Sequence, residues 1–113
     1  MNFDEIKSLL NSLDDPVLKL EALMDIGKTL SPIPDGKVGV EIKGCASRVE
    51  IYRGADKKFH AAADSALVRG IVAVLLSIKE AGLDFSEFGG LRLDFGAARL
   101  NGTAAMIEYL ETL

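Results

Sequence analysis

The run from Ala66 to Ile78 is the feature that most limits how this chain can fold. It reads ALVRGIVAVLLSI and carries one charge, at Arg69. A membrane-spanning helix needs roughly 18 or more apolar residues, so this run is too short and too charged to cross a bilayer. We therefore predict a buried helix, with Asp64 or Ser65 as its N-cap and Gly82 in the left-handed position after its last turn.

A buried helix needs other elements to pack against, and the rest of the sequence supplies them. Apolar residues at three- and four-residue spacing predict helices over 3–13, 15–30 and from about Leu100 onward, where Ala104, Ile107 and Leu110 form one stripe. A short helical turn is predicted over DFSEF, after the buried helix, and the GGLRLDFGAA segment that follows it is predicted to be a loop because it has little periodicity. Val49 and Ile51 alternate with polar residues, which indicates a strand with one packed face.

Three strands are predicted in all, over 38–42, 48–53 and 58–62, with RGADKK as the turn between the last two. The Pro- and Gly-rich segment Ser31–Gly39 is predicted to be a loop. The expected fold class is therefore α+β, with a small antiparallel sheet of about three strands packed against helices. The buried helix is expected to lie across that sheet.

Size, charge and cysteine content limit the possible partners. With 113 residues, the chain has the size of a single domain, residues 1–113, with one core. Its net charge of -4 argues against nucleic-acid binding, which needs clustered Lys and Arg, and a basic partner fits better. A single cysteine cannot form an internal disulfide, and the first residues resemble neither a signal nor a transit peptide. We therefore expect a cytoplasmic protein whose mature chain starts here, with no membrane partner.

Cys45, the one cysteine, follows Gly44 directly and precedes a predicted strand. A thiol beside a glycine at a sharp turn can be open to a bulky partner, as a nucleophile or acceptor requires. The alternative is a buried cysteine that packs as a small apolar side chain. His60, the one histidine, could serve as base for a thiol enzyme, although a surface strand histidine is the simpler interpretation. One Cys and one His are too few ligands for a zinc or cluster site.

Two further segments carry polar residues that could belong to a site. Asp64 and Arg69 lie on either side of a predicted helix start and could point toward a shared site. The alternative is an N-cap and a helix residue whose charge reaches solvent. Arg99 and Asn101 belong to RLNG, which reads as a loop entering the last helix. No glycine-rich phosphate loop, pair of catalytic carboxylates or GxSxG elbow is present in the sequence.

Three ordered blocks together resemble the SufE family of sulfur-acceptor proteins over nearly the whole chain. The family's Gly-Cys-Gln-Ser motif, preceded by a basic residue, is matched by KGCASRV, with Ala46 in place of the glutamine. Its Asp-Ser-Asp-Ala-x-Ile-Val-Arg-Gly block is matched by AADSALVRG, and its Ser-Arg-x-Asn-Gly block by ARLNG. The run before that arginine reads DFGAA here. The resemblance implies a SufE/IscU-like α+β fold, in agreement with the predicted order of elements.

The resemblance also implies a function. Cys45 would accept persulfide sulfur from a pyridoxal-phosphate-dependent, SufS-like cysteine desulfurase, enhance its activity, and pass the sulfur to a SufBCD-like iron-sulfur scaffold. The chain would be an accessory protein without a cofactor or metal of its own. The supporting residues implied by the resemblance are Gly44, Ser47, Asp64, Arg69, Arg99 and Asn101. The alternative is a regulatory binding module of the same fold that carries no sulfur. A further hypothesis is that Gly39 and Gly44 let the loop swing Cys45 toward the partner.

Overall fold

Four α-helices, one 3-10 helix and a three-stranded sheet make up the part of the chain that the computed structural model describes, residues 1–44, 47–94 and 97–113. Side chains are described for the same residues except 97–100. The elements in chain order are α1 (Phe3–Asn11), α2 (Pro16–Gly27), β1 (Val40–Glu41), β2 (Val49–Arg53), β3 (Phe59–Ala63), α3 (Ala66–Glu80), η1 (Phe85–Leu91) and α4 (Ala97–Glu111). The predicted α+β class is confirmed.

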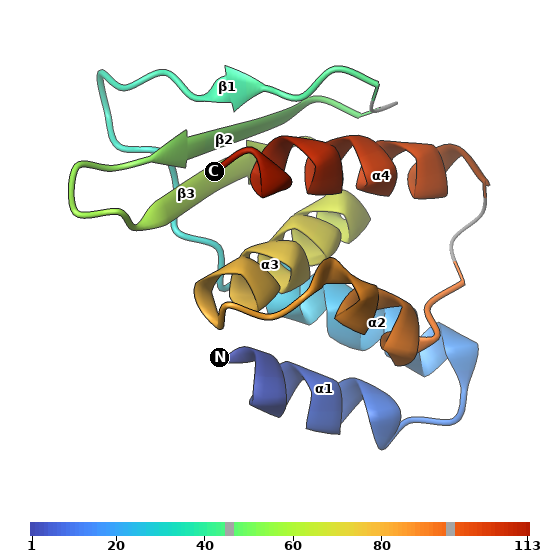
Figure 1. Ribbon diagram of the computed structural model, residues 1–113. Coiled ribbons are helices and arrows are strands. Elements are labelled where there is room, and N and C mark those ends of the chain that lie inside the picture. The colour runs from blue at the N-terminus through green and yellow to red at the C-terminus, as the bar shows by residue number, and fades with distance from the viewer. Residues whose placement is uncertain (45–46, 95–96) are drawn as a thin grey trace.

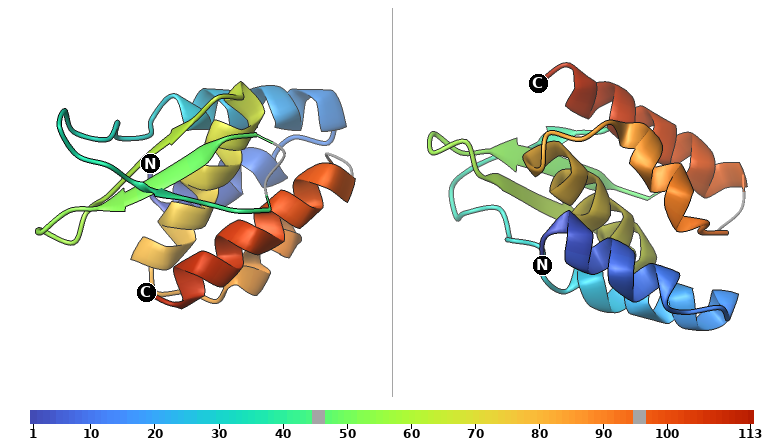
Figure 2. Two further views of the ribbon diagram at one scale, coloured as in Figure 1. Left: turned by 90° about the horizontal axis from the view of Figure 1, so that it is seen from above. Right: turned by 60° about the horizontal axis from the view of Figure 1, so that its bottom comes forward.

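The helices lie on one side of the sheet, and α3 lies between the sheet and the α1–α2 pair (Figure 1). The views in Figure 2 show α3 crossing beneath the strands, as its apolar sequence predicted. Every residue of α3 from Gly70 to Ile78 is buried. Ser65 caps the helix, since its side chain accepts the N–H of Val68. Gly82 follows the helix with φ +70, the left-handed conformation that the sequence predicted.

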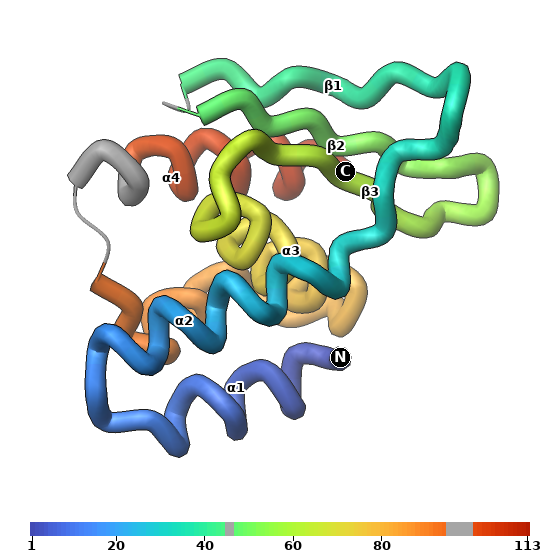
Figure 3. The backbone as a smooth tube through the Cα atoms, turned by 180° about the vertical axis from the view of Figure 1, so that it is seen from behind, coloured from blue at the N-terminus to red at the C-terminus, as the bar shows by residue number. Residues whose placement is uncertain are grey.

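The sheet is antiparallel with strand order β1-β2-β3. In β2, Val49 and Ile51 are buried while Glu50 and Tyr52 are half-buried on the opposite face. The segment after α2 runs beside β3 on its way to β1 (Figure 3), and the N–H of Ala61 donates to the carbonyl of Ser31 there. The edge of β3 is therefore partly covered by this segment.

Several predicted boundaries were wrong. The first strand is shorter than predicted and covers Val40–Glu41, with one further bond from the N–H of Ile42 to the carbonyl of Val49. Gly39 before it lies close to the incoming segment, since a Cβ there would lie 3.0 Å from Ile33 Cδ1. The short helix reaches Leu91 because its two glycines continue the 3-10 turns that the sequence was expected to leave as loop. The last helix begins at Ala97, in a stretch without apolar periodicity that predicted a loop.

The predicted stripe of α4 was also partly wrong. Ala104 is exposed and Ile107 is only half-buried, whereas Thr103, Met106 and Leu110 are buried. Both sets have helical spacing, and the small residues of this helix do not distinguish one face from its neighbour. The helix therefore presents a face one residue away from the predicted one.

Candidate functional site

The turn between β1 and β2 carries the predicted site. The strands remain hydrogen-bonded up to its base, where the N–H of Ile42 donates to the carbonyl of Val49 at 2.9 Å. Gly44 is exposed and has φ +92, a conformation that side chains with a Cβ rarely adopt. Cys45 lies outside the described residues, so its predicted role as sulfur acceptor stays a prediction. Ser47, on the other side of it in the sequence, is half-buried.

Helix α4 lies close to this turn. A Cβ on Gly44 would lie 3.3 Å from the Cβ of Ala105, so the turn approaches the middle of α4 closely. Asn101 is four residues before Ala105 and therefore lies one helical turn away on the same face. Its side chain is exposed. The structure thus places Gly44 against the helix that carries Asn101, while the side chain of Arg99 lies outside the described residues.

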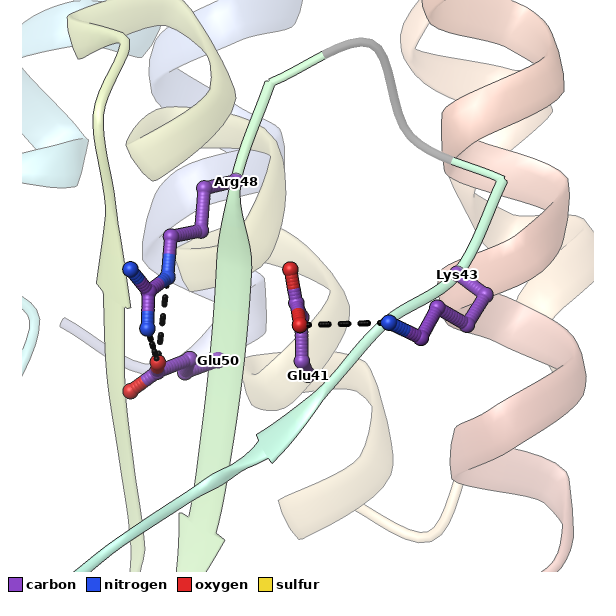
Figure 4. Close-up of polar contacts among 4 residues, drawn as sticks. All are labelled: Glu41, Lys43, Arg48 and Glu50. Carbon is purple, nitrogen blue, oxygen red and sulfur yellow. Dashed lines mark hydrogen bonds and ion pairs between the residues drawn. The ribbon is translucent and has the colours of Figure 1, made fainter.

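Two ion pairs lie on the strands beside the turn, one on each side of it (Figure 4). Lys43 Nζ lies 3.2 Å from Glu41 Oε2, and the guanidinium of Arg48 donates to Glu50 Oε1 through Nε at 3.1 Å and through Nη2. The hydrogen bond and charge of Glu50 raise the pKa of Arg48 above its ordinary value, with a further contribution from Glu41. Both basic residues that flank the turn are therefore paired with carboxylates.

The sheet register explains why these pairs form. Glu41 and Glu50 are direct partners across β1 and β2. Like charges in this position repel each other and destabilise the strand pair. Lys43 and Arg48 each compensate one of these carboxylates from the loop side of its strand. This arrangement was not predicted, although its signal is visible in the sequence as Glu-x-Lys before the turn and Arg-x-Glu after it.

Asp64 and Arg69 line different grooves, and the prediction that they could point toward a shared site stays a prediction. The exposed Asp64 lines a groove of about 260 Å³ together with Arg48 and Glu50. Arg69 lines a groove of about 420 Å³ against α2 and donates from Nε to the carbonyl of Ala63 at 3.0 Å. Arg69 nevertheless bonds to Ala63, a residue that lines the groove of Asp64.

His60 lies near the other end of the sheet. It pairs with Tyr52, close to the β2–β3 hairpin, and its Nδ1 lies 3.1 Å from the carbonyl oxygen of Pro32. At a rise of about 3.3 Å per strand residue, Tyr52 is roughly 13 Å along β2 from Arg48 at the base of the turn. This position does not favour a thiol enzyme with His60 as its base.

Gly39 does not flank the turn as the loop hypothesis assumed. It precedes β1, where a Cβ would lie 3.1 Å from the carbonyl oxygen of Ile51 and 3.2 Å from the Cβ of Glu50. Gly39 therefore allows close packing at the start of the sheet, and only Gly44 belongs to the turn. None of the helices formed by the described residues has the length and apolar character that crossing a bilayer requires.

Comparison with known proteins identifies the family of this chain. The model of SufE, the Fe-S metabolism associated domain, matches residues 4–113. The chain belongs to the SufE family. SufE-like protein 1, chloroplastic/mitochondrial, of Arabidopsis thaliana is 29% identical over 122 aligned residues, which cover 95% of this chain and 33% of that protein. This SufE chain thus spans about a third of the length of that relative.

Family membership associates the chain with Fe-S metabolism. The finer predictions concern the sulfur acceptor, its desulfurase and its scaffold, and they remain proposals. The Arabidopsis relative is named as a chloroplastic/mitochondrial protein. The cytoplasmic location predicted for this chain therefore stays a prediction.

Proposed function

We propose that this SufE chain is a sulfur carrier whose acceptor is Cys45. The observation that carries the proposal is the family match over residues 4–113, which includes a Gly44-Cys45 sequence between the two strands that form the described base of the turn. The positive φ of Gly44 and its exposure support a turn that a partner can approach. The donor would be a cysteine desulfurase, and an iron-sulfur scaffold would receive the sulfur.

The chemistry is an exchange between sulfur atoms. The desulfurase holds a persulfide, in which an outer sulfur is bonded to the sulfur of its own cysteine. The Cys45 thiolate attacks the outer sulfur, forming a new S–S bond as the old one breaks, and the desulfurase cysteine leaves as a thiolate. The proton on the outer sulfur travels with it, and no external oxidant or reductant is needed. The pyridoxal phosphate that generates the persulfide belongs to the desulfurase.

The surroundings of the turn suit a protein that docks to an enzyme. Lys43 and Arg48 are exposed and paired, so the charge near the turn is largely compensated rather than strongly positive. Asp64 adds an exposed carboxylate beside Arg48, and Asn101 is an exposed polar residue on α4. Such a mixed, solvated rim is typical of the edge of a protein–protein interface.

Replacing Cys45 by serine tests the proposal. If the chain is a sulfur carrier, Cys45→Ser should still bind the desulfurase, as measured by titration calorimetry. The variant should no longer raise the activity of the desulfurase, measured as the rate at which it releases alanine from cysteine. A module that acts by contact alone would keep both properties. A matched control moves the thiol by two residues in the same turn, in the double variant Cys45→Ser/Ser47→Cys. If position matters, this control binds without restoring full activation.

A further inference from the structure

A single peptide unit at the end of β3 is hydrogen-bonded on both sides. Its carbonyl, from Ala63, accepts from Arg69 Nε at 3.0 Å. Its N–H, from Asp64, donates to the carbonyl of Arg48 at 3.3 Å. The C=O and N–H of a trans peptide point in opposite directions, so Arg69 and Arg48 hold the same peptide plane from opposite edges. Hydrogen bonds arranged in such a chain polarise and strengthen one another.

Arg48 connects these hydrogen bonds to the turn between β1 and β2. It directly precedes β2 and lies three residues after Cys45 in the sequence. The bond from Asp64 extends the pairing of β2 and β3 one residue beyond the Val49–Ala63 pair, to the end of the turn (Figure 4 shows Arg48 there). The orientation of the Ala63–Asp64 peptide therefore determines where the second leg of the turn is held.

The base of the Arg69 side chain is itself held by packing. A Cβ on Gly27 of α2 would lie 2.9 Å from the backbone carbon of Arg69 and 3.0 Å from its Cβ. The two helices are thus in close contact at this residue. In the part of the chain that the structure describes, no carboxylate lies within ion-pair distance of Arg69. Its contact within the fold is the neutral carbonyl of Ala63 rather than an opposite charge.

We propose that Arg69 is a positioning residue for sulfur acceptance, which anchors the second leg of the Cys45 turn through the Ala63–Asp64 peptide. This inference rests on the proposed sulfur-carrier function and assigns to Arg69 a role inside the chain. It acts through an N–H donor at the ε position and not through the charge that it presents to a partner.

Three replacements of Arg69 separate these two roles. Glutamine places an N–H donor the same number of bonds from Cα as the arginine Nε, but it has no charge. Lysine keeps the charge and has a carbon at that position, whereas methionine has neither charge nor donor. Lys28→Met is the matched control, because Lys28 lines the same groove and its loss removes one positive charge. Thermal unfolding of each variant verifies that it folds.

Amide hydrogen exchange of Asp64, measured by NMR on the free protein, reports how firmly the peptide that Arg69 anchors is held against Arg48. Arg69→Met and Arg69→Lys remove the bond to the Ala63 carbonyl, which frees the peptide and should speed exchange of the Asp64 amide by up to about fivefold, while Arg69→Gln and Lys28→Met stay close to wild type. Sulfur acceptance from a desulfurase should follow the same order in kcat, with KM for the desulfurase unchanged. This split is expected because docking is intact and the turn is misplaced.

Two results would overturn the inference. The first is wild-type exchange at Asp64 in Arg69→Met. The second is sulfur acceptance that survives in Arg69→Lys and is lost in Arg69→Gln, which would assign Arg69 to charge recognition of the partner. If the wild type accepts no sulfur, the proposed function fails, and the exchange measurement still decides whether Arg69 anchors the turn.

Discussion

Replacing Gly70 by alanine should destabilise the protein, although alanine is the better helix former. Gly70 lies in α3 where this helix crosses α2. A Cβ at this position would lie 2.2 Å from the carbonyl oxygen of Leu23 and 2.8 Å from its carbonyl carbon, whereas ordinary contacts begin at 3.4 Å. Both atoms belong to the backbone of α2, so no side-chain rotation can make room. The helices would have to separate by about 1 Å, as hard-sphere packing requires.

The magnitude follows from two opposing terms. Alanine in place of glycine stabilises a helix interior by about 1 kcal/mol. Overpacking a well-packed contact costs about 1–3 kcal/mol, and the upper end applies here because the clash is with the backbone. The net loss in the free energy of unfolding is therefore about 2 kcal/mol, which lowers the melting temperature by roughly 10 °C in a domain of this size.

Urea unfolding followed by circular dichroism measures this loss. Gly89→Ala is the matched control, because no atom lies within 4 Å of the Cβ it would add. The control should change the free energy of unfolding by less than about 0.5 kcal/mol. A Gly70→Ala variant as stable as the wild type would refute the close crossing of α2 and α3.

Two further predictions concern charged groups. Arg48→Met leaves Glu50 uncompensated opposite Glu41, so urea unfolding should show a loss of stability that shrinks as salt screens the repulsion. A loss independent of salt would contradict this explanation. Asp84 accepts the N–H of Ser86 at 2.8 Å, and this hydrogen bond lowers the pKa of Asp84 below its ordinary 3.8. A lowered pKa in the folded state means that the carboxylate stabilises the fold above pH 3.8, and that this contribution is lost as the pH falls through the folded pKa. Wild type should therefore exceed Asp84→Asn in stability at pH 6, and the difference should disappear in acid.

The features that the sequence predicted are those that depend on local patterns. The apolar run of α3 and the alternation of Val49 and Ile51 identified a buried helix and a one-sided strand, and these follow from periodicity alone. The face of α4 was wrong because Thr103 and Ala104 are both small, and their burial is decided by what the helix packs against.

The contacts around the site depend on the register of the paired strands and on how the helices cross the sheet. The periodicity of the sequence does not predict either of these. Glu41 and Glu50 are nine residues apart in the sequence and become neighbours only once β1 and β2 pair. Arg69 matched a family block, yet its bond to Ala63 depends on how α3 leaves the sheet. That Asp64 and Arg69 line different grooves could not be read from their spacing in the sequence for the same reason.

Intact-protein mass spectrometry tests the central claim most directly. The SufE chain and its Cys45→Ser variant are each incubated with a cysteine desulfurase, pyridoxal phosphate and free cysteine, and then weighed with and without a reductant. The account predicts one added sulfur on the wild type, removed by the reductant and absent from the variant. Wild-type protein of unchanged mass, with a desulfurase that it binds and activates, would contradict the sulfur carrier and leave a regulatory binding module.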